Sequence, residues 1–186
     1  MMFKKIALLL MTFIMLVSFS TAEATSEGTG IAEGLNYSID DFHNRTIYFG
    51  RFDVSSAALY PLVAVDTTTH KPTMYIHANC AGNTGNWQYF DKIYVRTDSN
   101  SYTINCEEDF CQYYVASGLS LEETYQKKAD EQLIAIFRDI AMSKGVPTYR
   151  FSGKYQKIRE ITPAKKERIK KLLDLYDFYN KSADIK

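Results

Sequence analysis

The chain has no excess of charge of either sign, because its 186 residues carry 22 basic and 22 acidic side chains. A protein dedicated to nucleic acid usually has a strongly basic domain, so this balance argues against a nucleic-acid partner. The sequence also lacks a nucleotide-binding loop, a Gly-x-Ser-x-Gly turn and metal-ligand spacing. It therefore predicts no cofactor and identifies no catalytic residue.

Long hydrophobic runs are also scarce, and the one present lies at the N-terminus. Lys4 and Lys5 precede an apolar stretch of 12 residues, Ile6–Val17, and small residues follow as far as Ala24. This three-part pattern is typical of a signal peptide cleaved after Ala24. A membrane span needs about 20 apolar residues, so cleavage is favoured over an anchor. We expect an exported protein, periplasmic, in the cell envelope or extracellular, with no stable membrane anchor after cleavage.

Removal of that segment leaves 162 residues, a length that suits one domain. Residues 25–44 begin polar and rich in glycine, which predicts a flexible leader before a single domain over residues 45–186. Tryptophan occurs once, whereas tyrosine occurs 14 times. This excess of tyrosine suits sheet faces that are half buried and half wet.

Short segments rich in β-branched and aromatic residues predict the strands. Turn residues separate them, and Asp98–Asn100 is a good hairpin tip. The pattern predicts an α+β fold: an antiparallel sheet or sandwich of about six to eight short strands, with two helices near the C-terminus. The expected strands before the first helix are Thr46–Val54, Leu59–Val65, Thr73–Cys80, Trp87–Thr97, Ser101–Cys106 and Cys111–Val115.

The two helices are predicted from capping residues and periodicity. Ser120 with Glu123 forms a capping box, and apolar residues at helical spacing continue to Ile140. Gly145 and Pro147 end this helix. Pro163 opens the second helix after an expected strand pair at residues 147–151 and 155–161. The apolar stripe of the second helix is Ile169, Leu172, Leu173, Tyr176 and Tyr179.

Three cysteines follow the signal segment, so one pair is expected to bridge after export. Cys106 and Cys111 flank four residues. If those four form a hairpin loop, the two cysteines lie opposite each other within bridging reach. A bridge between Cys80 and Cys106 is the alternative. The remaining cysteine is expected to be a buried, unreactive thiol.

The most unusual loop is rich in glycine and amides and runs into the single tryptophan. Asn83 and Asn86 could form a sugar-binding edge, with Trp87 or Tyr89 as the stacking platform. The alternative is a plain connecting loop whose tryptophan begins a core strand. These four residues are the candidate ligand-binding residues of the sequence.

Charge is distributed unevenly along the chain. Residues 98–131 hold eight acidic side chains, and residues 154–171 hold eight basic ones. This could produce a dipolar surface that docks on an anionic envelope polymer, or merely two solvated helix faces. A metal site is not expected, because His77 and Cys80 point to opposite faces of one strand and His70 adds no motif spacing.

An ordered series of motifs runs from Trp87, Tyr89, Phe90, Asp91 and Lys92 through Tyr102 to Tyr149-Arg150-Phe151-Ser152-Gly153 and the lysine-rich last helix. This order resembles a family of uncharacterised secreted bacterial β-rich domains with no assigned activity, over most of residues 45–180. The resemblance implies export and a β-sheet domain with helices, and it carries no catalytic residues. In this arrangement Arg150 is expected to pair structurally with Asp91. The alternative for Asp91 is a bulge that shifts the register of its strand, and it is favoured because Phe90 also needs an apolar environment.

Three hypotheses for function remain. The first is a non-catalytic envelope or extracellular module that binds a polymer, a glycan or another protein. The second is a secreted hydrolase with a site assembled from distant residues, and the third is a small-molecule carrier with an aromatic interior. A His–acid pair in a deep pocket would favour the hydrolase, and an exposed aromatic patch near Trp87 would favour the binding module.

Overall fold

The structure is a computed structural model, and it describes residues 30–50, 57–82, 89–106, 111–116, 120–154 and 156–183. The side chains of residues 81–82, 111–116, 120–122 and 183 are outside this description. The predicted signal peptide, residues 1–24, also lies outside the described residues. Neither of the helices that the structure describes carries the continuous apolar stretch that a membrane crossing requires.

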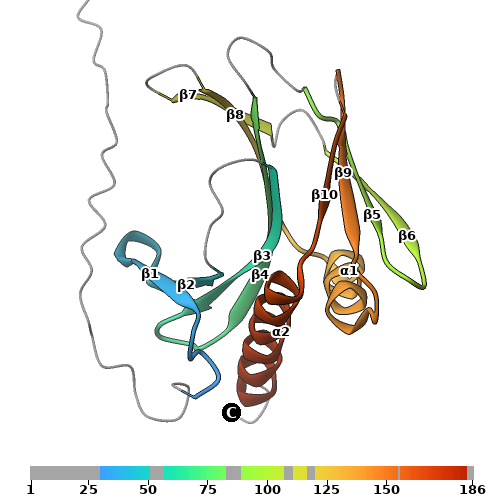
Figure 1. The fold of residues 1–186 in the computed structure, drawn as a ribbon. Helices are drawn as coiled ribbons and strands as arrows, with labels where there is room; N and C mark the ends of the chain where they lie inside the picture. The colour runs from blue at the N-terminus through green and yellow to red at the C-terminus, as the bar shows by residue number, and fades with distance from the viewer. Residues whose placement is uncertain are drawn as a thin grey trace, which may run out of the picture.

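The predicted α+β class is confirmed. In the part of the chain that is described, the strands form two antiparallel sheets, one of six strands and one of four, rather than six to eight strands in all (Figure 1). Sheet A has the strand order β1-β2-β3-β4-β8-β7. Its strands are β1 (Asn36–Asp40), β2 (Arg45–Phe49), β3 (Ala57–Asp66), β4 (Pro72–Gly82), β7 (Cys111–Ala116) and β8 (Ser120–Lys128). A short 3-10 turn, η1 (Asp41–His43), joins β1 to β2.

Sheet B has the strand order β10-β9-β5-β6. The predicted hairpin at Asp98–Asn100 and the predicted strand pair after the first helix both belong to this sheet and are confirmed. Two helices complete the fold, and the second begins at Pro163 as predicted. The remaining elements are β5 (Lys92–Arg96), β6 (Ser101–Asn105), β9 (Thr148–Ser152), β10 (Gln156–Glu160), α1 (Glu131–Met142) and α2 (Pro163–Ala183).

One face of sheet A is covered by α2 and by sheet B (Figure 1). α2 packs against β3 and β4 on one side and against α1 on the other. Toward the other end of β3 the two sheets meet directly, where the buried Tyr149 of β9 donates its hydroxyl to the carbonyl oxygen of Ala57 at 2.7 Å. The largest fully buried side chains are Tyr125, Tyr149, Phe137, Phe151, Met74, Ile76, Ile93, Ile136, Ile140, Ile161, Leu172 and Leu175.

The prediction that a helix begins at Ser120 is wrong. Residues 120–128 form β8, which pairs with β4 and β7, and the helix begins only at Glu131. The true N-cap is Asp130, whose carboxylate accepts the backbone N–H of Leu133 at 2.9 Å. The part of the apolar stripe that lies in α1 is confirmed, since Leu133, Ile136, Phe137 and Ile140 are buried.

The predicted leader, residues 25–44, also contains structure. β1 occupies Asn36–Asp40 and pairs with β2 residue by residue, from Asn36 opposite Phe49 to Asp40 opposite Arg45. The carboxylate of Asp40 accepts Arg45 Nε–H at 2.8 Å. The polar composition of this segment predicted a flexible leader, but the segment contains an edge strand that the ion pair between Asp40 and Arg45 stabilises.

The β5–β6 hairpin is held to α1 by the carboxylate of Asp139. One of its oxygens accepts from Thr97 Oγ1 at 2.7 Å, Asn100 Nδ2 at 3.1 Å and the Tyr102 hydroxyl at 2.9 Å. Burial disfavours the charged form, but the three hydrogen bonds outweigh it and lower the pKa of Asp139 below its usual value. Asp98 at the hairpin tip likewise accepts from Ser143 at the end of α1.

The hairpin assumed between Cys106 and Cys111 is wrong, because β6 is an edge strand of sheet B and β7 an edge strand of sheet A. The side chain of Cys111 is not among those described, so a Cys106–Cys111 bridge stays a prediction. Cys80 and Cys106 are both buried, and no disulfide joins them. The alternative bridge is therefore absent from the structure.

Candidate ligand-binding site at the junction of the two sheets

Three neighbouring strands of sheet A place one buried row of side chains at the junction of the sheets. Ala57 on β3 lies opposite Cys80 on β4, and Cys80 lies opposite Glu123 on β8. Each of the three is at most 2% exposed. Glu123 is therefore a carboxylate in the interior, which is unfavourable unless its oxygens are hydrogen bonded.

Sheet B contributes two cations to the same junction. Lys157 and Arg159 on the edge strand β10 lie opposite the buried Phe151 and Tyr149 of β9. Directly opposed residues share one face of a sheet, so both cationic side chains lie on the interior side, where they are half-buried. Inward-pointing charges of this kind also protect an edge strand from pairing with another chain.

The oxygens of Glu123 accept two backbone N–H groups. Oε1 accepts from Tyr89 at 2.7 Å, and Oε2 accepts from Phe90 at 3.1 Å. Hydrogen bonds to an ionised acceptor are stronger than neutral ones, so this pair offsets much of the cost of burying the carboxylate. Glu123 thereby fixes the segment that leads into sheet B.

Tyr89 is held in an unusual backbone conformation by this arrangement. Its φ is +47°, in the left-handed region that a bulky side chain rarely adopts. The next residue, Phe90, is buried and meets the ring of Phe151 edge-on at 4.8 Å, whereas Tyr89 is 51% exposed. The segment therefore anchors Phe90 in the core and presents the preceding residue, Tyr89, to solvent.

Cys80 is an unreactive thiol at this junction. Burial is the largest influence and raises the pKa of Cys80 to about 11, while the nearby cations Lys157 and Arg159 partly oppose the shift. The thiolate is the nucleophilic form of cysteine, and such a pKa leaves it almost unpopulated at neutral pH. This geometry agrees with the prediction of one buried, inert thiol.

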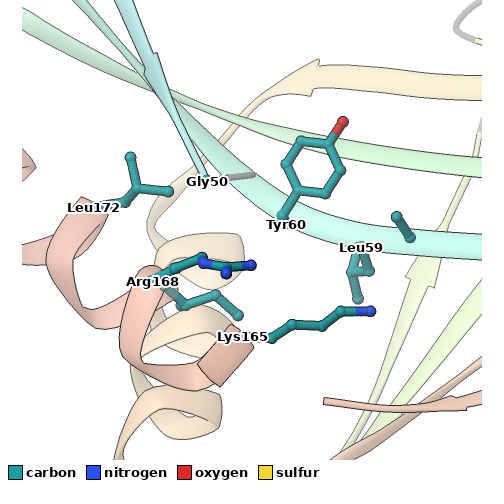
Figure 2. A pocket seen from close by; sticks show the side chains of 8 residues that line it. Gly50, Leu59, Tyr60, Lys165, Arg168 and Leu172 are labelled. Carbon is teal, nitrogen blue, oxygen red and sulfur yellow. The ribbon is translucent and has the colours of Figure 1, made fainter. Parts of the chain in front are cut away.

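A small cavity of about 40 Å³ lies beside the junction, between α2 and β3 (Figure 2). Its floor is apolar, and two cations of α2, Lys165 and Arg168, extend toward β3. Gly50, directly after β2, lies against the stem of Arg168: a Cβ at this glycine would be 3.3 Å from Arg168 Cδ. The lining residues are Gly50, Ala58, Leu59, Tyr60, Lys165, Arg168, Ile169 and Leu172.

The three histidines lie in separate surroundings. His43 Nδ1 is 2.9 Å from Asp40 Oδ2 at an exposed turn. This is the one histidine ion pair among the described residues, and it lies at the surface. His77 stacks on Tyr60 with ring centroids 4.9 Å apart, and His70 stacks on Tyr179. Among the described residues, no three His, Cys, Asp or Glu side chains gather as a metal site would require.

Of the four candidate ligand-binding residues, only Tyr89 lies in the described part of the chain. Asn83, Asn86 and Trp87 lie outside it, so their part in a binding edge stays a prediction. Glu123, which positions Tyr89, was missed, because the capping-box interpretation assigned its carboxylate to a helix N-terminus. The available signal was the two-residue spacing of Glu123, Tyr125 and Lys127, which places all three on one face of an extended strand.

The predicted pair of Asp91 and Arg150 does not form in the structure. Asp91 is exposed, and the guanidinium of Arg150 lies 4.5 Å from the centroid of the Tyr94 ring. The local change of register, which was the alternative for Asp91, is present. Phe90 and Ile93 are both buried although they are three positions apart, because β5 begins only at Lys92.

Comparison with known proteins does not extend these observations. No family model matches the chain, and no curated protein and no solved structure is significantly similar to it. The resemblance to secreted bacterial domains therefore stays a prediction, and function must be argued from the geometry of the junction.

Proposed function

We propose that this protein is an exported, non-catalytic binding module that holds a glycan polymer of the cell envelope or its surroundings. The observation that carries the proposal is Tyr89, an exposed aromatic residue whose backbone is fixed by a buried carboxylate. Strained backbone persists only where its surroundings enforce it, and such strain concentrates at functional sites. Glu123 is the enforcing group here, since it binds the N–H groups of Tyr89 and Phe90.

A fixed, exposed tyrosine suits the binding of sugars. Its ring offers a flat apolar face for a pyranose ring, and its hydroxyl adds a hydrogen bond. Holding the backbone of Tyr89 in place before binding reduces the entropy that is lost when the ligand docks. The amide-rich sequence of residues 83–87 precedes Tyr89 directly and supports the same proposal from the sequence.

The test is sedimentation of the purified protein with cell-wall sacculi and with a panel of insoluble polysaccharides. We expect Tyr89→Ala to weaken binding about twofold to tenfold, because a stacked aromatic pair contributes about 0.5–1.5 kcal/mol beyond its buried area. Tyr37→Ala is the matched control, since Tyr37 is 43% exposed on β1 and should leave binding unchanged. Equal losses for both variants would count against a site at Tyr89.

The hydrolase hypothesis is tested in the same experiment. The protein is assayed in parallel on esterase, glycosidase and peptidase substrates. Turnover that disappears when one acidic or histidine side chain is replaced would overturn the binding-module proposal. His43 and Asp40 are the first pair to replace, because their side chains are 2.9 Å apart.

A further inference from the structure

We propose that the cavity between α2 and β3 is a binding site for a carboxylate group, with Arg168 and Lys165 as its cationic residues. The two side chains are three residues apart on α2 and therefore emerge on the same face of the helix. Figure 2 shows both extending beneath β3 on the side to which Leu59 points, whereas the ring of the other lining residue, Tyr60, points to the opposite side of the strand. This site is separate from the proposed stacking of a glycan on Tyr89 and does not depend on it.

The charge of Arg168 has no acidic partner within the described residues. The ion pairs found there join Asp40 to His43 and Arg45, and Arg138 to Asp177. Other cations of α2 have structural partners instead. Lys166 Nζ donates to the carbonyl oxygens of Ser143 and Gly145, and Lys171 Nζ donates to that of Glu33. Among the described residues, Arg168 is thus a cation at a cavity to which no carboxylate contributes.

The position of Arg168 is defined by packing. Its stem lies against Gly50, where a side chain would come within 3.3 Å. β2 pairs with β3 only as far as Tyr48 opposite Val63, so Leu59 and Tyr60 lie beyond the end of that pairing and can form the cavity wall. A guanidinium that is already in place loses less entropy when it binds a carboxylate in the two-pronged mode.

The size of the cavity favours a carboxylate over a larger anion. Its volume is about 40 Å³. One water needs about 10–15 Å³ on this measure, so the cavity takes about three water-sized groups. A carboxylate has three heavy atoms, whereas sulfate and phosphate have five. The apolar floor of Leu59, Ile169 and Leu172 suits the carbon that carries the carboxylate.

The surroundings of the cavity also favour an anion. Lys157 and Arg159 of β10 lie on the interior side at the junction of the sheets. The cavity adjoins this junction, because its wall residue Leu59 is two residues along β3 from Ala57, which lies opposite Cys80. The one buried acid of this junction in the described residues, Glu123, is already bound to backbone N–H groups. The two cations of the lining, Lys165 and Arg168, would attract an anion to the cavity before it binds.

A carboxylate could reach this site from two sources, a small carboxylic acid or an acidic polysaccharide. The test is titration of the full chain from residue 25 with butyrate and with polygalacturonate at constant ionic strength, followed by NMR. Dextran sulfate and neutral dextran are the comparison polymers. We expect saturable binding of butyrate, and of polygalacturonate if the polymer is the source, with weaker binding of dextran sulfate.

Arg168→Gln should lower the affinity for butyrate about tenfold or more, because hydrogen bonds to a charged partner are lost. Lys170→Gln, an exposed position on the same helix, should change it less than twofold. Gly50→Ala keeps every charge but displaces the Arg168 stem, so it should weaken butyrate binding about threefold. This variant tests the role of Arg168 if Arg168→Gln fails to fold. Equal effects of Arg168→Gln and Lys170→Gln, or full affinity in Gly50→Ala, would overturn the proposal.

Tyr89→Ala separates this site from the proposed glycan site. Because Tyr89 does not line the cavity, its replacement should leave butyrate binding unchanged. Loss of sacculus binding in Tyr89→Ala with retained butyrate binding supports both proposals. Absence of saturable butyrate binding in the unaltered protein would refute the carboxylate site alone.

Discussion

The interior of this protein has two ends with different chemistry. At the helix end, α2 packs on sheet A and α1 packs on α2 with aliphatic and aromatic side chains, and Leu172, Leu175 and Phe137 are at most 1% exposed. At the sheet end, the buried row contains Cys80 and Glu123, and the opposing edge strand contributes cations. One hydrophobic cluster includes residues of both ends, so they belong to the same core.

The difference separates the end that supplies apolar stability from the end that carries the proposed glycan-binding residue. Apolar burial is the main favourable contribution to folding, and the helix end supplies it without charged groups. A buried carboxylate contributes little net stability unless it is fully hydrogen bonded, so its presence requires another reason. Here the carboxylate fixes the backbone of Tyr89, which is 51% exposed.

The largest expected effect is at the helix end. Leu175→Ala should lower the free energy of unfolding by about 3–5 kcal/mol, because Leu175 is fully buried between packed elements and truncation leaves a cavity. The measurement is urea unfolding followed by circular dichroism. Met142→Ala on α1, where the side chain is 82% exposed, is the control and should change stability by about 0.5 kcal/mol or less. Similar values for the two variants would show that the helix end is not the apolar core.

Glu123→Gln should have the next largest effect. The amide can accept only one of the two N–H groups, and its own NH₂ would face the other, so we expect a loss of about 2–3 kcal/mol. Amide exchange at Tyr89 and Phe90 should accelerate in the same variant. Glu160→Gln on the exposed side of β10 is the matched control. If both variants unfold at the same urea concentration, Glu123 does not support the sheet end.

The sequence predicted the helix end better than the sheet end, and the reason is periodicity. In α2 the stripe from Ile169 to Tyr179 has only the helical period, and it is correctly assigned. In and directly after β8, by contrast, Leu121, Tyr125 and Ala129 are four residues apart, a spacing that places side chains on one face of a helix and equally on one face of a strand. The capping box at Ser120 then favoured the wrong choice.

The site was harder to predict because its groups come together only through long-range pairing. Glu123 meets Tyr89 across 34 residues, and Lys157 reaches Cys80 from the other sheet. A local hairpin was assumed between Cys106 and Cys111, yet the chain crosses from one sheet to the other at this point. Short sequence distance gave the wrong partner there, whereas the local turn at Asp98–Asn100 was predicted correctly.

The smallest expected effect concerns the thiol at the sheet end. Burial raises the pKa of Cys80 from 9.0 to about 11, so between these values the unfolded chain releases the proton first. Because the pKa of Cys80 is raised in the folded state, the stability that the buried thiol contributes is fully present below about pH 9. It is lost as the pH rises toward 11. Cys80→Ala should therefore cost about 1 kcal/mol near pH 8 and progressively less above pH 9.

The measurement is urea unfolding of both proteins at several pH values from 8 to 10. This range ends below the region in which Tyr48, whose pKa is raised to about 12, begins to ionise. Lys157→Met sharpens the test, because removing this cation should push the pKa of Cys80 higher and slow its alkylation by iodoacetamide further. Rapid alkylation of Cys80 in the folded protein at pH 8 would show instead that the sheet end is open to solvent, and its charged groups would then need no buried partner.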